Sequence, residues 1–434
     1  MRISILTVFP DLYSEFLKTS LVKRAQMEER VEFNIAGFSS FCAPKERIDG
    51  PTVGHGMGMA LRPEVVDRAI VSSEQLFGPA LKIFMTPQGK KLTQNMLKDL
   101  AKKMVDSKHV MFVAGRYEGI DARVHDEYAD LELSIGDYVL MGGDLPVMVV
   151  LESVLRYVPG VVGRQESVEK DSFSTAFVDF PTYTVPPRKW KDREIPEILL
   201  SGNHAAMEEW RKKTAVQRSV IHHFDWVRSH VESKEDRALV VKAMPAHYVA
   251  LLHDQVIVQE GVVGTSSVTS MDIHDIARSS KTYGIKEYFV VTPLEDQQKI
   301  VETILQFWHT SGVEYNANRS DAVKLITIKE SLDSTIETIM KKEGKKPLVI
   351  GTSARAVEGV ELLSFYDQSK VWEQERPVLF IFGTAKGLSE DLLQRCDFVL
   401  MPIEGFVLFN HLSVRSAVAI ILDRWMGINM VKMD

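Results

Sequence analysis

The sequence predicts an α/β protein with two parallel-sheet domains and a helical segment between them. Short apolar runs that end in glycine are typical of strands buried on both faces of a parallel sheet. These runs alternate with segments whose apolar residues recur at helical spacing, as such a sheet requires. The alternation stops near residue 160 and starts again near residue 247. We therefore expect a first domain at 1–162, an interdomain linker at 163–176, a helical domain at 177–246 and a second domain at 247–434.

Length and composition set the broad class. A chain of 434 residues suggests two to four domains at roughly 100 to 200 residues each. Its 45% hydrophobic and 26% charged residues are typical of a soluble globular protein. The formal net charge of -7 neither supports nor excludes a nucleic-acid partner, because a local basic face decides such binding.

Cysteine content and the N-terminus indicate the compartment. Cys42 and Cys396 are the only cysteines, so neither a disulfide framework nor a cysteine metal site is expected. The apolar N-terminus is too short for a signal-peptide core and is followed by Asp11. No run approaches the ~18 apolar residues of a membrane helix. We expect a cytoplasmic protein with no membrane partner.

The first domain begins with alternating strands and helices. We expect strands at 3–9, 31–35, 81–85 and 110–114, and helices at 12–26, 62–77 and 94–105. Pro63 suits the first turn of the second of these helices. Between them, residues 46–64 include four glycines from Gly50 to Gly58 and cannot form a packed element. This loop is either a binding or gating segment or a flexible connector.

Residues 110–146 contain the strongest ligand-binding pattern. The run 110–114 ends at Gly115, and a second apolar run, 138–141, ends at Gly142 and Gly143, before a helix at 147–157. We interpret both runs as buried strands whose glycine loops let the backbone approach a ligand. Charged residues lie between the two turns: Arg116, Glu118, Asp121 and Asp137. The alternative is a pair of ordinary tight turns. No phosphate-loop or dinucleotide fingerprint is present, which gives an ATPase or NAD enzyme no specific support.

A basic helical segment and a second α/β pattern follow. A helix is expected at 195–219, and cationic residues with interleaved tryptophans occur in and before it: Arg188, Lys189, Trp190, Lys191, Arg193, Trp210, Arg211, Lys212, Lys213 and Arg218. This cluster is either a solvated face or a surface that contacts phosphates. Further on, strands are expected at 248–252, 287–291, 324–326, 348–351 and 378–382, and helices at 272–283, 294–311 and 332–343.

Several motifs over roughly residues 1–246 resemble the bacterial tRNA (guanine-N1)-methyltransferase family, TrmD. They are ISILTVFPDLY, PQGKKL, GRYEGIDARV, SIGDYVLMGGDLPVM, YVPGVVG with EKDSF, and LLSGNHAAMEEWR, in the family's order. One segment departs: the usual GGGPGM reads VGHGMGM here, which keeps Gly54, Gly56 and Gly58 but introduces His55 and Met57. The resemblance implies a SPOUT fold with a trefoil knot in its sheet, although knots are nearly absent from protein folds.

The same resemblance implies the site. S-adenosylmethionine would be held by loops 84–89, 115–119 and 134–143, with these cofactor-binding residues: Phe84, Met85, Thr86, Pro87, Gly115, Tyr117, Gly119, Ser134, Ile135, Gly136, Asp137, Tyr138, Val139, Leu140, Gly142, Gly143 and Pro146. Arg156 and Asp171 would be the catalytic pair, with Glu118 facing the reaction or a Mg²⁺ ion. Gly56, Gly58, Arg116 and Asp179 would contact the substrate. The substrate would be the guanosine at position 37 in the tRNA anticodon loop, and the active site would lie across a homodimer interface.

The residue types fit that chemistry. N1 of guanine carries a proton at neutral pH, so a general base is required, and Asp171 is the candidate although an ordinary Asp has a pKa of ~3.9. Arg156 can bond guanine O6 and stabilise the charge that develops there. A base in a loop can be splayed out and read on its edges. Without the resemblance, Asp171 is interpreted as a solvated linker carboxylate. A non-catalytic RNA-binding protein would keep the basic helices but would not need Asp171 and Arg156 together.

The C-terminal half resembles TrmH-like SPOUT methyltransferases. HDIARSSKTYGI matches the first motif with Arg278 at the catalytic arginine, FGTAKGL the second, and FNHLSVRSAVAIIL the third, so the expected site residues are Arg278, Gly383, Gly387, Asn410 and Ser413. Asp275 replaces a usual Asn, and FGTAKGL lacks an acidic residue before its glycines. The whole chain is thus expected to contain two SPOUT-type knotted α/β domains around a small all-helical domain. The second would bind S-adenosylmethionine and methylate RNA, for example at ribose 2′-oxygens. The alternatives are a non-catalytic RNA-binding or dimerisation module, with Arg278 an ordinary surface arginine.

Overall fold

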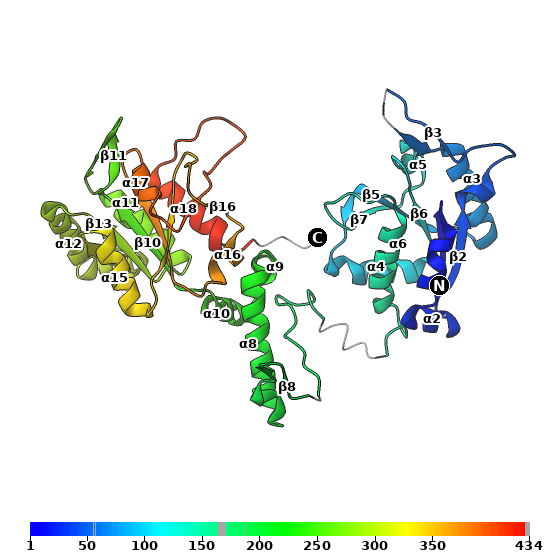
Figure 1. The fold of residues 1–434 in the computed structure, drawn as a ribbon, viewed down its shortest axis with the longest axis horizontal. Coiled ribbons are helices and arrows are strands. Elements are labelled where there is room, and N and C mark those ends of the chain that lie inside the picture. The colour runs from blue at the N-terminus through cyan, green and yellow to red at the C-terminus, as the bar shows by residue number, and fades with distance from the viewer. Residues whose placement is uncertain (55, 57, 164–170, 186, 430–434) are drawn as a thin grey trace. The chain divides into compact units, whose positions relative to one another are not determined.

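The protein is described by a computed structural model that covers residues 1–54, 56, 58–163, 171–185 and 187–429. The chain forms two compact units, Met1–Ser174 and Thr175–Asp434, each with its own sheet (Figure 1). His55 and Met57 lie outside the described residues, as do 164–170 of the expected linker.

The first unit is built on a parallel five-stranded sheet of order β2-β1-β6-β5-β7. Its strands are β1 (Arg2–Thr7), β2 (Glu32–Gly37), β5 (Leu81–Lys91), β6 (His109–Ala114) and β7 (Leu131–Ser134). Its helices are α1 (Tyr13–Phe16), α2 (Ser20–Met27), α3 (Pro63–Phe77), α4 (Gln94–Ser107), α5 (Ala122–Tyr128) and α6 (Asp144–Val154), with short 3-10 turns at η1 (Pro10–Leu12), η2 (Phe38–Phe41) and η3 (Leu155–Tyr157). The expected parallel α/β fold is confirmed for this unit.

Alternate side chains of these strands enter two cores. Val110 and Phe112 pack with α2, α4 and α6, whereas Met111 and Val113 pack with α3 and α5 on the other face. Met85 of β5 is in register with Ala114 of β6 and with Leu133 of β7. The C-terminal ends of β6 and β7 therefore lie on either side of Met85, where the first part of β5 ends at a register shift, and open α/β sheets bind ligands at such strand ends.

The prediction of a buried strand at 138–141 is wrong. These residues form an exposed loop, with Val139 88% and Met141 84% exposed, and the strand is instead β7, which ends at Ser134. An apolar run has the same pattern whether a sheet or a ligand covers it, so periodicity alone could not separate the two.

Three other boundaries of the first unit differ from prediction. The helix expected at 12–26 breaks between α1 and α2, because the Thr19 hydroxyl donates to the Phe16 carbonyl (2.7 Å) and competes with the helical pattern. Part of the glycine-rich segment, expected not to form a packed element, forms the antiparallel hairpin of β3 (Asp49–Pro51) and β4 (Met59–Leu61). Strand β5 continues through the expected loop to Lys91, with a register shift against β7 between Met85 and Lys90.

The second unit contains a parallel seven-stranded sheet of order β14-β13-β10-β17-β15-β18-β16. Its strands are β10 (His247–Leu252), β13 (Glu287–Val291), β14 (Ile326–Lys329), β15 (Leu348–Gly351), β16 (Leu362–Leu363), β17 (Val378–Gly383) and β18 (Phe398–Leu400), and β11 (Val256–Gln259) and β12 (Val262–Gly264) form a hairpin. Its helices are α11 (Ser270–Thr282), α12 (Glu295–His309), α13 (Gly312–Tyr315), α14 (Ala317–Val323), α15 (Leu332–Glu343), α16 (Gln368–Trp372), α17 (Glu390–Leu393) and α18 (Val414–Met426).

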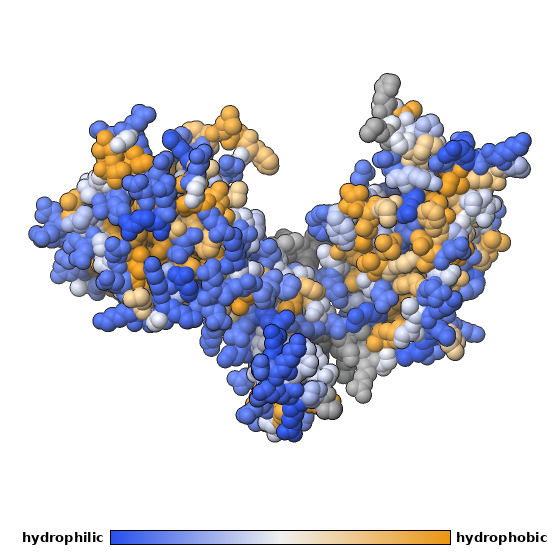
Figure 2. Space-filling view, in the orientation of Figure 1, coloured by the Kyte–Doolittle hydropathy of each residue, from blue (hydrophilic) through white to orange (hydrophobic). Residues whose placement is uncertain are grey.

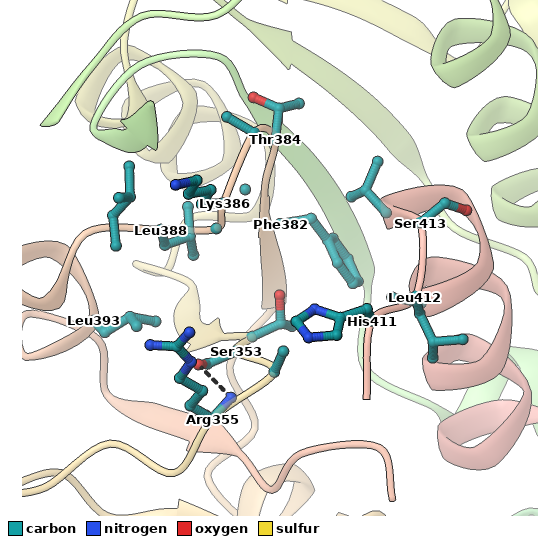
Figure 3. Close-up of a pocket in the computed structure, with 18 of the residues that line it drawn as sticks. Ser353, Arg355, Phe382, Thr384, Lys386, Leu388, Leu393, His411, Leu412 and Ser413 are labelled. Atoms are coloured by element: carbon teal, nitrogen blue, oxygen red, sulfur yellow. Dashed lines mark hydrogen bonds between the residues drawn. The ribbon is translucent and has the colours of Figure 1, made fainter. Parts of the chain in front are cut away.

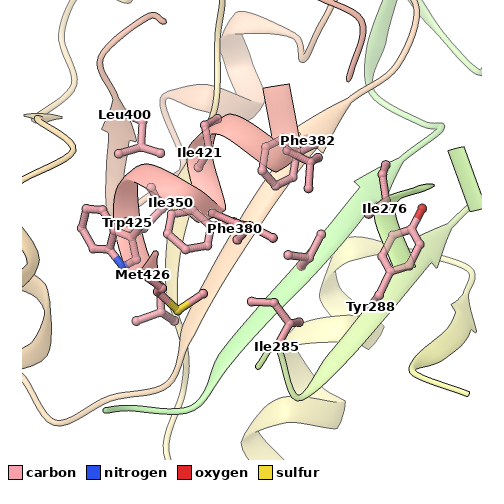
Figure 4. Packing of buried hydrophobic residues seen from close by; sticks show 14 of the residues in the cluster. Ile276, Ile285, Tyr288, Ile350, Phe380, Phe382, Leu400, Ile421, Trp425 and Met426 are labelled. Carbon is pink, nitrogen blue, oxygen red and sulfur yellow. The ribbon is translucent and has the colours of Figure 1, made fainter. Parts of the chain in front are cut away.

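The second core is centred on β17 and α18. Phe380 and Phe382 of β17 pack against Ile421 and Trp425 of α18, as Figure 4 shows. The strand expected at 324–326 is displaced to β14, because α14 continues to Val323 and Lys324 closes it.

The segment between the two sheets is not all-helical. Besides η4 (Glu197–Leu200), α8 (His204–His222), α9 (Phe224–His230) and α10 (Lys234–Ala243), it contains a hairpin of β8 (Lys189–Trp190) and β9 (Arg193–Glu194). The helix expected from 195 starts only at His204, where the Asn203 side chain accepts a hydrogen bond from the Ala206 N–H (3.1 Å). In the part of the chain described, no helix has both the length and the apolar character that crossing a membrane requires.

Candidate functional site

Two glycine-containing segments of the first unit meet at the end of β6. The Gly143 N–H donates to the Gly115 carbonyl (2.7 Å), and Arg116 forms an antiparallel bridge with Gly142. A Cβ on Gly143 would lie 3.0 Å from both Ala114 Cα and Gly115 N, so a larger residue would require the backbone of β6 to move by a few tenths of an ångström. The backbones of loops 115–119 and 134–143 are therefore held together at the end of β6.

The β3–β4 hairpin is a third segment that packs beside loop 115–119. The Glu118 N–H donates to the Met59 carbonyl (2.9 Å), and a Cβ on Gly58 would lie 2.6 Å from Glu118 Oε1. Gly58, expected to contact the substrate, and Glu118, expected to face the reacting groups, are thus neighbours. The Arg116 guanidinium lies 4.8 Å from the centroid of the Phe9 ring.

The remaining predicted cofactor residues of the first unit differ in burial. Those at the strand ends and in α6 are buried: Phe84, Met85, Gly115, Ser134, Gly143 and Pro146. Those in the loops are partly or fully exposed: Thr86, Pro87, Tyr117, Gly119, Ile135, Gly136, Asp137, Tyr138, Val139, Leu140 and Gly142. Asp137 forms an ion pair with Lys91 of β5, which ties the third loop to the strand beside it.

Arg156 and Asp171 are in direct contact. Arg156 lies in η3, immediately after α6, and its guanidinium donates a hydrogen bond to the Asp171 carboxylate. Their side chains are 47% and 33% exposed, so both groups remain accessible from solvent. The contact places the Arg156 guanidinium, a hydrogen-bond donor, beside the Asp171 carboxylate, a hydrogen-bond acceptor.

Two of the expected substrate-contacting residues lie outside the contacts described above. Asp179 lies in the second unit, and Gly56 packs beside Thr52 in the hairpin loop. Among the residues that the structure describes, no three His, Cys, Asp or Glu side chains gather as a metal site, so the expected Mg²⁺ near Glu118 has no ligand cluster.

The sequence interpretation missed a buried polar cluster behind the glycine loop. Asp144, the first residue of α6, accepts hydrogen bonds from the Thr7 hydroxyl and from the Tyr13 hydroxyl (3.1 Å), and all three residues are buried. Burial, together with the Asp144 carboxylate, raises the pKa of Tyr13 far above its usual value. The cluster anchors Gly142 and Gly143 to the end of β1. An acidic residue directly after two glycines was the available signal.

The second unit has a cleft of about 970 Å³ at the C-terminal ends of β15, β17 and β18 (Figure 3). Four of the five expected residues line it: Gly383, Gly387, Asn410 and Ser413. A Cβ on Gly383 would lie 2.6 Å from Leu388 N, and the Asn410 side chain donates to the Ala354 carbonyl (2.8 Å). The fifth residue, Arg278, is exposed on α11 and is not among the described residues that line the cleft.

Polar groups at the cleft floor were also missed. The Ser266 hydroxyl contacts both His253 Nδ1 (3.2 Å) and the Thr384 hydroxyl (2.5 Å), which joins the ends of β10 and β17. Burial lowers the pKa of His253 to about 4, so its imidazole is neutral near pH 7. Nothing in the local sequence pattern around 253, 266 and 384 connects these three residues.

Comparison with known proteins identifies the family. Residues 1–229 match the family model described as tRNA (Guanine-1)-methyltransferase TrmD. The chain belongs to the TrmD family. Residues 246–427 match a second family model, that of SAM-dependent RNA methyltransferases. This TrmD-family methyltransferase therefore carries a second methyltransferase domain after the TrmD region.

Two relatives with similar sequences agree with this division. The tRNA (guanine-N(1)-)-methyltransferase of Nitratidesulfovibrio vulgaris is 34% identical over 98% of this chain and 99% of its own length. The protein of the same name from Bacillus subtilis is 38% identical over 55% of this chain and 96% of its own length. The crystal structure of the tRNA (m1G37) methyltransferase from Aquifex aeolicus covers 50% of this chain and 93% of its own, with 32% identity and a TM-score of 0.42.

Proposed function

We propose that the first unit methylates N1 of the guanosine at position 37 of tRNA, with Asp171 as the general base. The observation that carries the proposal is the contact between Arg156 and Asp171. Guanine presents the N1–H donor and the O6 acceptor next to each other on one edge. An acceptor and a donor held side by side in the protein match that edge.

The two side chains divide the chemistry. Asp171 accepts the N1 proton, and Arg156 donates to O6, where negative charge develops as the proton leaves. S-adenosylmethionine supplies an electrophilic methyl group when it is bound. The residues present suit such a ligand, because the Gly143–Gly115 backbone hydrogen bond holds the two loops together and the exposed apolar side chains of 138–141 can cover a bound molecule. No step of this proposal uses magnesium.

We further propose the trefoil knot and the homodimer that the family resemblance implies. The return of residues 142–143 from the edge strand β7 to the end of β6 supports a threaded loop. In the dimer, Asp171 of one chain would serve cofactor held by the other. Mixing Asp171→Ala chains with cofactor-defective Gly143→Ala chains tests this: if activity returns in the mixed dimers, the site is shared between chains.

For the second unit we propose S-adenosylmethionine binding in the cleft at β15, β17 and β18 and methyl transfer to RNA. The glycine-lined strand ends and the 970 Å³ volume support this. Titration of the whole chain with S-adenosylhomocysteine tests it. Binding of two ligands per chain, reduced to one by a bulky substitution at Gly383, is the expected result. One ligand per chain would favour the alternative of a non-catalytic RNA-binding or dimerisation module.

Mass spectrometry of nucleosides from an unmodified tRNA transcript tests the first activity. The expected product is 1-methylguanosine at position 37, absent from a transcript with adenosine there. A methyl group on another atom of the base would contradict the assignment of Asp171 and Arg156.

A further inference from the structure

The helices that follow the first sheet are built into the core of the second methyltransferase domain. Val216 and Val220 of α8 and Phe224 and Val227 of α9 are buried in the same apolar cluster as Phe380 and Trp425. The Phe224 and Trp372 rings pack edge to face with centroids 4.8 Å apart. These helices therefore have no separate core of their own.

Polar contacts lock the same junction. Arg228 is only 3% exposed, and its guanidinium donates to the carbonyls of Asp423 (2.8 Å), Arg424 (2.7 Å) and Gly427 (2.8 Å) at the end of α18. The Ser369 hydroxyl donates to the Ile221 carbonyl (2.5 Å). The other end of α18 lines the cleft through Val414 and Ala417. One helix thus runs from the second cleft to the base of α8 and α9.

The physical boundary differs from the family boundary. The TrmD match extends to residue 229, beyond Arg228, whereas the compact units divide between Ser174 and Thr175. The last part of the TrmD region is therefore rigidly attached to the second cleft and is joined to the first sheet through a single chain crossing.

The exposed surface of α8, with the adjacent hairpin, suits RNA, although Lys212 lies on the side of Val216 and forms an ion pair with Asp236 of α10 (3.5 Å). Between 188 and 218 the sequence has eight Lys and Arg residues against five Asp and Glu, in a chain of net charge -7. Seven of these cations are exposed: Arg188, Lys189, Lys191, Arg193, Lys212, Lys213 and Arg218. Trp190 is exposed beside them, with the Lys191 ammonium 4.7 Å from its ring centroid. Figure 2 shows hydrophilic colour over this part of the second unit. Cations around an exposed aromatic ring bind phosphates and stack on bases.

We propose that the second cleft methylates a tRNA held by this α8 surface, so that both methyltransferase domains act on the same class of RNA. The inference rests on the proposed tRNA methylation by the first unit. In the second reaction the sulfonium–methyl bond of S-adenosylmethionine breaks and a bond forms from the methyl group to an RNA oxygen or nitrogen. The displaced proton passes to solvent, and S-adenosylhomocysteine leaves as a neutral thioether.

The experiment maps methyl groups on an unmodified tRNA transcript treated with the full chain carrying Asp171→Ala. We expect 1-methylguanosine to disappear while methylation continues at a second nucleoside. Lys213→Glu with Arg218→Glu, both at exposed positions of α8, added to that chain, should raise the half-saturating tRNA concentration roughly tenfold, because the charge is reversed at two proposed phosphate contacts. The matched control carries Lys299→Glu on α12 and Lys341→Glu on α15, two exposed positions of the same unit. These substitutions should leave the half-saturating tRNA concentration unchanged.

Three outcomes would overturn the proposal. These are the absence of any second methyl group on tRNA, methylation of ribosomal RNA fragments but not of tRNA, and a second methylation that the α8 substitutions do not affect. The methylation pattern produced by the unsubstituted chain separates a failure of the first activity from a failure of the second. If it forms 1-methylguanosine at position 37 but adds nothing else, the first function stands and only the present inference fails.

Discussion

Arg156 donates a hydrogen bond to the carboxylate of Asp171, although 15 positions separate them in the chain. Replacing Asp171 with Asn keeps the shape but removes the proton acceptor. We expect 1-methylguanosine formation to fall about 10²- to 10⁴-fold, as for loss of a general base, with S-adenosylhomocysteine affinity unchanged. Single-turnover kinetics and calorimetric titration measure the two quantities. Asp99→Asn, at an exposed carboxylate on α4, is the control. Full activity of the Asp171 variant would rule out its role as base.

The guanidinium geometry of Arg156 provides a second test. Lys keeps the positive charge but not the planar fork that can bond O6 and Asp171 together. We expect kcat of Arg156→Lys to lie between those of the unsubstituted enzyme and Arg156→Ala, with KM for S-adenosylmethionine unchanged in both. Equal rates for Lys and Ala would mean that charge at this position does not assist the reaction.

The close approach of Gly143 to β6 predicts a cofactor defect. In Gly143→Ala the new methyl group would press on the backbone of Ala114 and Gly115, and overpacking of this kind costs about 1–3 kcal/mol. We expect the loop to move away and relieve this strain. If returning it to the ligand-bound position costs about 1.4 kcal/mol, S-adenosylhomocysteine binding to the first unit weakens roughly tenfold. Gly163→Ala, where a Cβ meets nothing within 4 Å, should bind normally. Normal binding by Gly143→Ala would separate this loop from the cofactor site.

His247 predicts acid sensitivity of the second unit. Its Nε2 accepts from the indole N–H groups of Trp372 (3.1 Å) and Trp425 (3.2 Å), and Nδ1 donates to the Pro245 carbonyl (2.7 Å). Burial lowers its pKa to about 4 in the folded state, against about 6.5 when unfolded. Between pH 4 and pH 6.5, His247 is therefore protonated in the unfolded chain but neutral in the folded protein. The stabilisation is complete above pH 6.5 and is lost as pH falls toward 4, by roughly 3 kcal/mol.

Thermal unfolding between pH 7.5 and 4.5 measures this effect. His253 and His274, whose pKa values are lowered by burial in the same direction, also contribute to the slope, so His247→Gln should remove only part of the pH dependence. His309→Gln, at an exposed site on α12, should not change it. A steeper loss of stability for His247→Gln would contradict the assignment.

Removing the hydrogen bonds of Arg228 should destabilise the packing of α9 against the end of α18. Arg228→Met keeps the length of the side chain but leaves three carbonyls without their donor, each loss costing about 1–3 kcal/mol. We expect a lower unfolding temperature for the second unit and a largely unchanged one for the first. Hydrogen exchange should increase at α9 and at the end of α18. Uniform destabilisation of both units would show that the junction is not local to the second.

Local patterns predicted most of the scaffold. The apolar runs at 110–114 and 348–351 coincide with β6 and β15, since a buried parallel strand is apolar at every position and needs no knowledge of its partners. The prediction of a strand at 138–141 failed for the same reason: an exposed apolar loop has the composition of a buried strand. Gly383, Gly387 and Asn410, expected from the resemblance of their motifs to TrmH-like enzymes, line one cleft, and their role in binding stays a prediction.

The amino-acid sequence by itself determined the alternation of strands and helices, the glycine turns and the family, because each depends on neighbouring residues or on recognisable motifs. The tertiary structure alone decided the hydrogen bonds of Asp144 with Thr7 and Tyr13 and the burial of Arg228 against α18. These contacts join residues 131 to 199 positions apart. Local periodicity cannot encode them, since they form only when distant segments pack into one core.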